Sequence, residues 1–172
     1  MNKAKRVVDH MEAEIASAIC TEIGTIDEGA TPLKQAKYIN EILNVAGSKN
    51  ICMKDTMRKC GGCCLAESLV NTAKKLYAKS ESITEFLGYL NEAHIGGGNL
   101  HILDGKIIGI YKECYCNIPK QIKGMNKNYC ECSAGWYMRL FSEVFGKNVT
   151  VDIIDTISNG ATECTFEISD YE

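Results

Sequence analysis

Residues 133–169, SAGWYMRLFSEVFGKNVTVDIIDTISNGATECTFEIS, decide the fold because a helical pattern is followed there by two strand patterns. The first part repeats large apolar side chains at helical spacing, which predicts an amphipathic helix over residues 133–145. The remainder alternates apolar and polar side chains around Asn159-Gly160, a dipeptide typical of tight turns. We therefore predict that the helix is followed by a hairpin of strands 149–156 and 161–169.

A second hairpin is predicted just before this stretch. Asp104-Gly105 is another turn dipeptide, and apolar side chains alternate in the flanking segments 99–103 and 106–116. The triple glycine at residues 96–98 precedes the hairpin, and we interpret it as a linker between helical and strand patterns. Residues 96–172 therefore predict a ββαββ arrangement.

The region before the triple glycine carries helical patterns throughout. We predict one helix over residues 3–23 and another over 31–45, with Pro32 at its first turn, where proline is well tolerated. A third helix should follow the CGGCC segment of residues 60–64, and a fourth should open at Ser82.

These patterns define an α/β (α+β) fold class. An N-terminal helical layer carrying CGGCC, residues 1–95, should pack on the antiparallel ββαββ sheet of residues 96–172. We expect the two regions to form one compact domain, since 172 residues are enough for a shared core.

Charge and hydropathy exclude several classes of partner. The net charge is −3, and no run of Lys and Arg exceeds a pair, which argues against nucleic acid as the main partner. No segment approaches the roughly 20 apolar residues that span a bilayer, and the N-terminal residues lack an export-signal pattern. We therefore predict a cytoplasmic protein with no membrane partner, and a homodimer is left open as a further partner.

Cysteine is the unusual residue in this composition. There are 10 cysteines in 172 residues, and without an export signal we expect reduced thiols rather than a disulfide scaffold. Reduced, clustered thiols are typical of metal sites, redox centres and nucleophilic catalysis, whereas isolated ones are often small buried apolar residues. We assign Cys20 and Cys52 to that packing class. The chemistry is then expected at Cys60, Cys63, Cys64, Cys114, Cys116, Cys130, Cys132 and Cys164.

Three of the cysteine motifs carry spacing that suits metal ligation. They are Cys60-Gly61-Gly62-Cys63-Cys64, Cys114-Tyr115-Cys116 and Cys130-Glu131-Cys132. The last two bring four thiols from two segments, which suits tetrahedral zinc or an iron–sulfur cluster. If Cys63 and Cys64 also open the helix that follows, its N-terminal amides would stabilise thiolate and lower the pKa of these thiols.

Two other functions remain open. A thiolate at Cys132 or Cys64 could attack a small cyclic amidine or amide, with Arg139 binding the carboxylate of the substrate. If the protein is an enzyme, we thus expect a hydrolase of C–N bonds in a small cyclic substrate. Alternatively, the cysteine pairs could cycle between thiol and disulfide as a redox sensor.

The C-terminal region resembles two known families. Gly135-Trp136, Gly146, Gly160, Cys164 and Phe166 match the pattern at the end of four-vinyl-reductase-type small-molecule-binding domains. The Cys-x-Cys-Ser-x-Gly-Trp pattern of residues 130–136 is similar to bacterial proteins grouped with L-2-amino-thiazoline-4-carboxylic acid hydrolase. The resemblance spans about a third of the chain, residues 106–169.

This resemblance implies an α/β domain that holds a small molecule between helices and sheet. It also implies that Cys164 and Trp136 lie near the ligand or metal. The sensor-type domains carry a further metal-binding cysteine at a position that corresponds to Thr156 here, so a site of their type would need the Cys-x-Cys pairs as replacement ligands.

Overall fold

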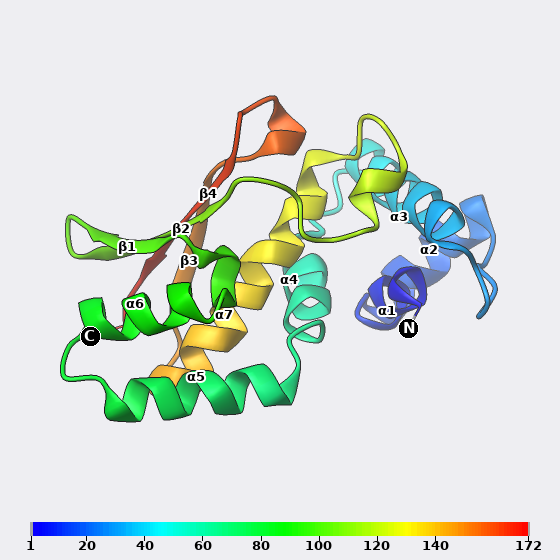
Figure 1. Cartoon of the computed structure of the whole chain (residues 1–172). Coiled ribbons are helices and arrows are strands. Elements are labelled where there is room, and N and C mark those ends of the chain that lie inside the picture. The colour runs from blue at the N-terminus through cyan, green and yellow to red at the C-terminus, as the bar shows by residue number, and fades with distance from the viewer. Residues whose placement is uncertain (1, 172) are drawn as a thin grey trace.

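The structure, a computed structural model that describes residues 2–171, combines α-helices with one four-stranded antiparallel sheet (Figure 1). The predicted α+β fold class and the helical N-terminal part are confirmed. The helices are α1 (Lys3–Asp9), α2 (Ala13–Ile23), α3 (Pro32–Ser48), α4 (Lys54–Gly62), α5 (Glu67–Lys79), α6 (Ile83–Glu92) and α7 (Glu131–Phe145), and the strands are β1 (Leu100–Leu103), β2 (Lys106–Tyr111), β3 (Thr150–Asp155) and β4 (Cys164–Ser169).

The sheet joins two hairpins in the order β1-β2-β4-β3. Strands β2 and β4 pair in the centre, where Gly109 lies opposite Phe166, and a register shift between Ile153 and Asp155 interrupts the outer pair β3 and β4. Helices α5, α6 and α7 lie on one side of the sheet (Figure 1). Gly146 adopts a left-handed conformation that ends α7, which glycine accepts without steric cost.

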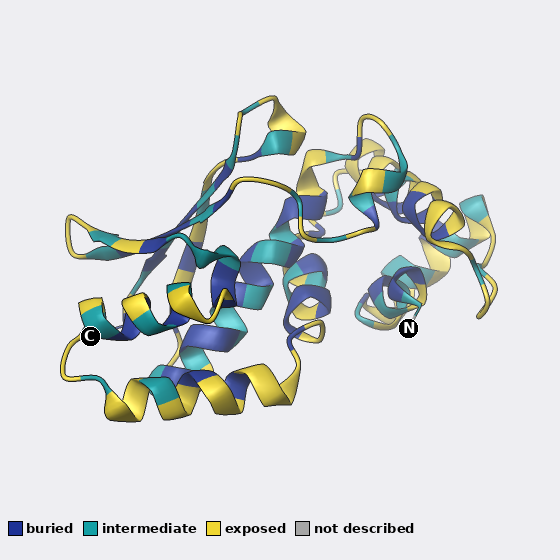
Figure 2. Ribbon diagram, viewed as in Figure 1, coloured by how far each residue is buried: buried dark blue, intermediate teal, exposed yellow. Residues whose placement is uncertain are grey.

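The buried side chains form two cores rather than one. The sheet core contains residues of α5, α6, α7 and the sheet, among them Tyr137, Phe141 and Phe166. The helical core contains residues of α1 to α4 together with the loop before α7. Helix α7 belongs to both, because Cys132 packs in the helical core and Ala134 in the sheet core; the buried residues continue along this helix in Figure 2. The two cores therefore divide near the CGGCC segment and not at the triple glycine.

The helix predicted over residues 3–23 is in fact two helices. Helix α1 ends at Asp9, and α2 begins at Ala13 after an extended Glu12. Both helices pack against α3, which a single straight helix could not do along its whole length. The helix from Pro32 is confirmed, with Thr31 as its N-cap, and runs on to Ser48.

Three predicted local structures are wrong. The helix predicted to follow the CGGCC segment is present as α5, but Cys63 and Cys64 do not open it, because α4 ends at Gly62 and α5 begins only at Glu67. Strand β2 ends at Tyr111, so Cys114 and Cys116 lie in a loop rather than on one strand face. The triple glycine is no linker but a turn packed against the sheet core, where the Tyr137 hydroxyl donates to the carbonyl of Gly96 over 2.8 Å.

Candidate functional site

Glycines bring α4 and α7 into unusually close contact. A Cβ atom on Gly61 would overlap the carbonyl oxygen of Cys132, and one on Gly135 would overlap that of Arg58. Only glycine lets two helix backbones approach this far. The crossing places the end of α4, with its cysteines, directly beside the first turn of α7.

Three thiols meet at this crossing, and we call Cys60, Cys64 and Cys132 the thiol cluster. The Cys64 thiol is near enough to those of Cys60 and Cys132 for each of them to shift its pKa. Its sulfur also lies 3.4 Å from the carbonyl oxygen of Cys60. Cys60 and Cys132 are buried, whereas Cys64 is exposed. The cluster thus has one accessible sulfur and two that are shielded.

Two basic side chains from α1 contact the thiol cluster. The Lys3 ammonium lies 3.0 Å from the sulfur of Cys132 and 3.5 Å from that of Cys116. The Arg6 guanidinium lies 3.4 Å from the sulfur of Cys64. Lys3 is only 8% exposed, so its charge is held away from bulk water. A buried ammonium requires a nearby negative charge, and the sulfurs are the groups placed to supply it.

The hydrogen bonds and charges concentrate ionisation on one sulfur. Hydrogen bonds from Cys132 and Cys60, helped by the charges of Lys3 and Arg6, hold the pKa of Cys64 well below its ordinary value although burial opposes this. The hydrogen bond to Cys64 and burial raise the pKa of Cys60 and of Cys132. Burial alone would lower the pKa of Lys3, but its interactions with the ionisable groups around it, Cys132 first and then Tyr129, raise the pKa above the ordinary value. Within the cluster, ionisation is therefore favoured at Cys64 over Cys60 and Cys132, with Arg6 and Lys3 as the nearby cations.

The thiol cluster opens into a cavity of about 1100 Å³ between the two cores. We call the elements around the helical core the helical half and those around the sheet core the sheet half. Part of the cavity wall comes from the helical half, including Lys3 and Tyr129, and part from the sheet half, including Tyr111 and Trp136. Among the residues that the structure describes, none of those lining the cavity is an aspartate or a glutamate. The cysteines in the wall are Cys64, Cys114, Cys116, Cys130, Cys132 and Cys164.

A second group of thiols lies elsewhere in the same wall. Cys114, Cys130 and Cys164 are near enough for their charges to influence one another. Burial is the largest effect on Cys114 and Cys164, and it raises the pKa of each. The Cys130 thiol donates to the hydroxyl of Ser158 over 3.4 Å, so this group has its own polar neighbour. The Cys-x-Cys motifs are thus divided, since Cys132 joins the thiol cluster while Cys114 and Cys130 join the second group.

The described residues offer no ready metal centre. Within residues 2–171, no group of three or more His, Cys, Asp or Glu side chains is arranged to hold a metal ion. The zinc or iron–sulfur site predicted from the cysteine spacing remains a prediction.

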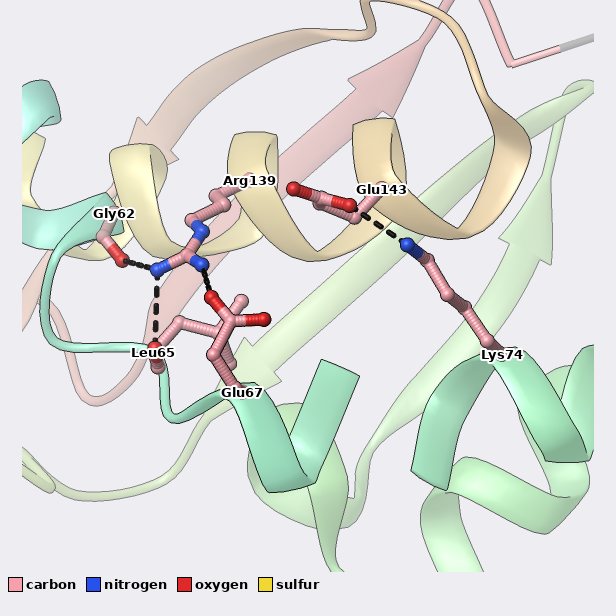
Figure 3. A network of polar contacts seen from close by, with 6 residues as sticks. All are labelled: Gly62, Leu65, Glu67, Lys74, Arg139 and Glu143. Atoms are coloured by element: carbon pink, nitrogen blue, oxygen red, sulfur yellow. Dashed lines mark hydrogen bonds and ion pairs between the residues drawn. The ribbon is translucent and has the colours of Figure 1, made fainter. Parts of the chain in front are cut away.

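Cys63 and Arg139 do not line the main cavity but line a second, smaller cavity. The Cys63 sulfur lies 3.3 Å from Nε2 of His10. The Arg139 guanidinium donates to the carbonyls of Gly62 and Leu65, both over 3.1 Å, and pairs with the carboxylate of Glu67 (Figure 3). Figure 3 also shows a neighbouring pair on the same face of α7, formed by Glu143 and Lys74 at 2.7 Å. Arg139 therefore fixes the loop after α4, and the structure does not bring it to Cys132 as a substrate-binding group.

Several residues of the site were missed by sequence reasoning. Lys3 and Arg6 sit in a helix whose composition looks solvent-exposed, and no local pattern marks them as partners of cysteines. Tyr129 was also missed; its hydroxyl lies 3.0 Å from the Cys116 sulfur, and its ring lies 5.2 Å below the Lys3 ammonium. The glycines of CGGCC are the sequence feature that marks this site. Gly61 lets α4 pack closely on α7 and does not form a turn around a metal.

The chain belongs to a defined protein family. A family model described as a family of unknown function (DUF6144) matches residues 4–172. No curated protein matches the sequence significantly. Among solved structures, the crystal structure of an H-NOX protein from S. oneidensis in the Fe(II)NO ligation state is similar, with a TM-score of 0.49, 14% identity and 98% coverage of each chain. Similarity of this degree implies nothing about ligand or activity. Over the part of the chain described here, no helix is both long and apolar enough to cross a membrane.

Proposed function

We propose that the protein binds a small organic anion in the cavity between its two cores, next to the thiolate of Cys64. One observation carries this proposal: the cavity of about 1100 Å³ has aromatic rings and lysines in its wall but, among the residues described, no acidic side chain. Ligand sites are typically apolar cavities with a few placed polar groups. The rings of Tyr111, Tyr115 and Trp136 suit a flat apolar body.

The charges of the wall favour a negatively charged ligand. Lys3 and Lys120 both line the cavity, whereas the 22 Asp and Glu residues of the chain contribute nothing to its wall among the residues described. Charges interact more strongly in a partly desolvated cavity than in water, so an anionic group gains more here than at the surface.

The resemblance of residues 106–169 supports the same kind of ligand. The substrate named in L-2-amino-thiazoline-4-carboxylic acid hydrolase is itself a small ring with a carboxylate. Four-vinyl-reductase-type domains are small-molecule-binding modules. That this chain is related to either of these two groups is itself part of the proposal.

Thiol-dependent hydrolysis is the second candidate, and the low pKa of Cys64 favours it. A persistent thiolate in a cavity wall could attack the ring carbon of a cyclic amidine, which would open a C–N bond after water enters. Cys132 is the less suitable nucleophile, because burial and its hydrogen bond to Cys64 raise its pKa. Turnover that survives Cys64→Ser would exclude this candidate.

Binding of zinc or of an iron–sulfur cluster by the cysteines is a further candidate function. The second thiol group, Cys114, Cys130 and Cys164, favours it because three sulfurs face one cavity. Tetrahedral sites need their ligands brought closer than the described residues hold them, so we derive no step through a metal. Metal analysis of anaerobically purified protein tests this directly.

Binding of the organic anion can be tested with a matched pair of probes. A naphthalene carboxylate and the corresponding naphthalene methanol differ in charge but present the same ring. We expect fluorescence titration to give about tenfold tighter binding of the carboxylate, the effect of one charged hydrogen bond.

Two isoleucine substitutions then locate the binding. Ile122→Trp places a large ring in the cavity wall, whereas Ile154→Trp adds the same ring at a side chain that is 59% exposed on β3. We expect the first variant to lose the carboxylate probe and the second to keep it. Equal binding of both probes, or unchanged binding by Ile122→Trp, would contradict the proposal.

A further inference from the structure

We propose that Cys64 and Cys132 form a redox-active dithiol that exchanges with small organic disulfides entering the cavity, with Lys3 as the positioning charge. Both cysteines line the same cavity beside the close contact of Gly61 with the Cys132 backbone, and Cys64 is exposed whereas Cys132 is buried. Lys3 lies 3.0 Å from Cys132, and Arg6 lies 3.4 Å from Cys64, so each sulfur has its own cation. This activity needs only the thiols and is independent of the anion-binding proposal.

The first step begins at Cys64. Its thiolate attacks one sulfur of the small disulfide, forms a mixed disulfide and expels the other half as a thiolate. Cys64 suits this role because it lines the cavity and is the thiol of the cluster with the depressed pKa. The reaction removes the negative charge that had balanced the buried ammonium of Lys3.

The loss of that charge prepares the second step. With Cys64 in a disulfide, its hydrogen bond no longer opposes ionisation of Cys132, and the Lys3 ammonium is left without its thiolate. The Cys132 proton then leaves to the expelled thiolate or to water. The new Cys132 thiolate attacks the Cys64 sulfur and releases the second half of the reagent.

The electrons balance in this sequence. The two protein thiols lose two electrons as they form the Cys64–Cys132 disulfide, and the small disulfide gains them as it becomes two thiols. The cations stabilise the reduced, thiolate-bearing form, which makes the protein disulfide easily reduced again. The exchange can therefore run in both directions without a further cofactor.

Cys60 is the competing partner for the second step. It also contacts Cys64, but it is fully buried, and its sulfur makes no hydrogen bond to Lys3 among the contacts of the described residues. The direct Lys3 contact therefore selects Cys132. A variant of each cysteine separates the two possibilities.

The exchange can be followed with bis(thionitrobenzoate) disulfide, which releases a coloured thiolate at each step. The exposed Cys52 and Cys63 are first replaced by serine to remove competing thiols. With less than one equivalent of reagent, we expect two coloured thiolates per disulfide consumed and a peptide that links Cys64 to Cys132. Cys132→Ser should release only one and keep the other half on Cys64, whereas Cys60→Ser should behave as the parent does.

Lys3 can be tested in the same assay. We expect Lys3→Gln to slow the second release about tenfold and to move its pH midpoint upward, because Cys132 loses the contact that favours its thiolate. Lys3→Arg keeps the charge and should restore the parent profile. A stable adduct on Cys64 in the parent, two releases from Cys132→Ser, or first labelling at another thiol would each overturn the proposal.

Discussion

The two halves of the molecule are packed with different side chains. All four phenylalanines of the chain lie in the sheet half, where Phe86, Phe141 and Phe145 meet edge to face or stack. The helical half has no buried phenylalanine among the residues described, and its core instead includes Met11, Met53, Met57 and Met125. Aromatic rings hold specific geometries, whereas methionine adapts to irregular gaps.

This difference shows which half is the scaffold of the site. The sheet half packs most of α7, including Trp136, and the helical half delivers Lys3, Arg6 and Cys64 from elements with a more adaptable core. The cavity lies where the two halves meet. Substitutions in the sheet half, at the junction of α4 and α7 and in the helical core should therefore differ in how much stability they remove.

The largest loss of stability is expected from the scaffold. Phe141 is fully buried and stacks on both Tyr137 and Phe145. Phe141→Ala should lower the free energy of unfolding by about 3–5 kcal/mol, because it removes apolar contact and leaves a cavity. Urea denaturation under reducing conditions measures the change. Met57→Leu in the helical core should cost less than about 1.5 kcal/mol, and equal losses would refute the comparison.

The junction of α4 and α7 should be nearly as sensitive. Gly61→Ala forces a methyl group onto the backbone of Cys132, which we expect to cost about 3 kcal/mol. Gly47→Ala is the matched control, since nothing lies near its Cβ position and alanine favours helix by about 0.5–1 kcal/mol. The same denaturation experiment compares both variants. A Gly61→Ala protein as stable as the control would show that the two helices do not cross as described.

A smaller loss is expected from the ion pair at the same junction. Arg58 contacts Glu131 at 2.7 Å and donates to the carbonyl of Val151 over 2.8 Å, which ties α4 to α7 and β3. Arg58→Ala should cost about 2–3 kcal/mol because it leaves a partly buried carboxylate unpaired. The exposed pair of Lys49 and Glu22 is the control, and Lys49→Ala should change stability by about 0.5 kcal/mol or less. Equal losses of stability for Arg58→Ala and Lys49→Ala in thermal or urea unfolding would contradict a stabilising role for the Arg58 contacts at the junction.

Much of the sheet half could be predicted from local patterns. The Asp104-Gly105 turn, the amphipathic helix and its end at Gly146 depend on neighbouring residues, and the structure confirms them. The Asn159-Gly160 hairpin is also present, although 3-10 helix η4 (Ile157–Asn159) lengthens its connection. Such features are encoded within a few residues of where they form.

The arrangement of the site could not be predicted in the same way. The spacing of Cys60, Gly61 and Cys64 suits a loop around a metal as well as a helix end pressed against another helix. Only the distant partner, Cys132 on α7, decides between the two. Likewise, Lys3 becomes a buried partner of sulfur only when α1 folds against α4, a contact that no local pattern records.

The central claim is that Cys64 is a thiolate next to the cavity, and the pH dependence of its alkylation tests this most directly. Alkylation is followed by iodoacetamide labelling and peptide mapping. Because only thiolate reacts, the labelling rate of an ordinary thiol rises about tenfold with each unit increase in pH until the pH reaches its pKa of about 8.5. Because the folded protein holds the pKa of Cys64 well below its ordinary value, we expect its labelling rate to stay flat from about pH 5 to pH 8. The same residue in the urea-unfolded chain should regain the steep dependence. A rate for folded Cys64 that climbs with pH as steeply as in the unfolded chain would contradict the account.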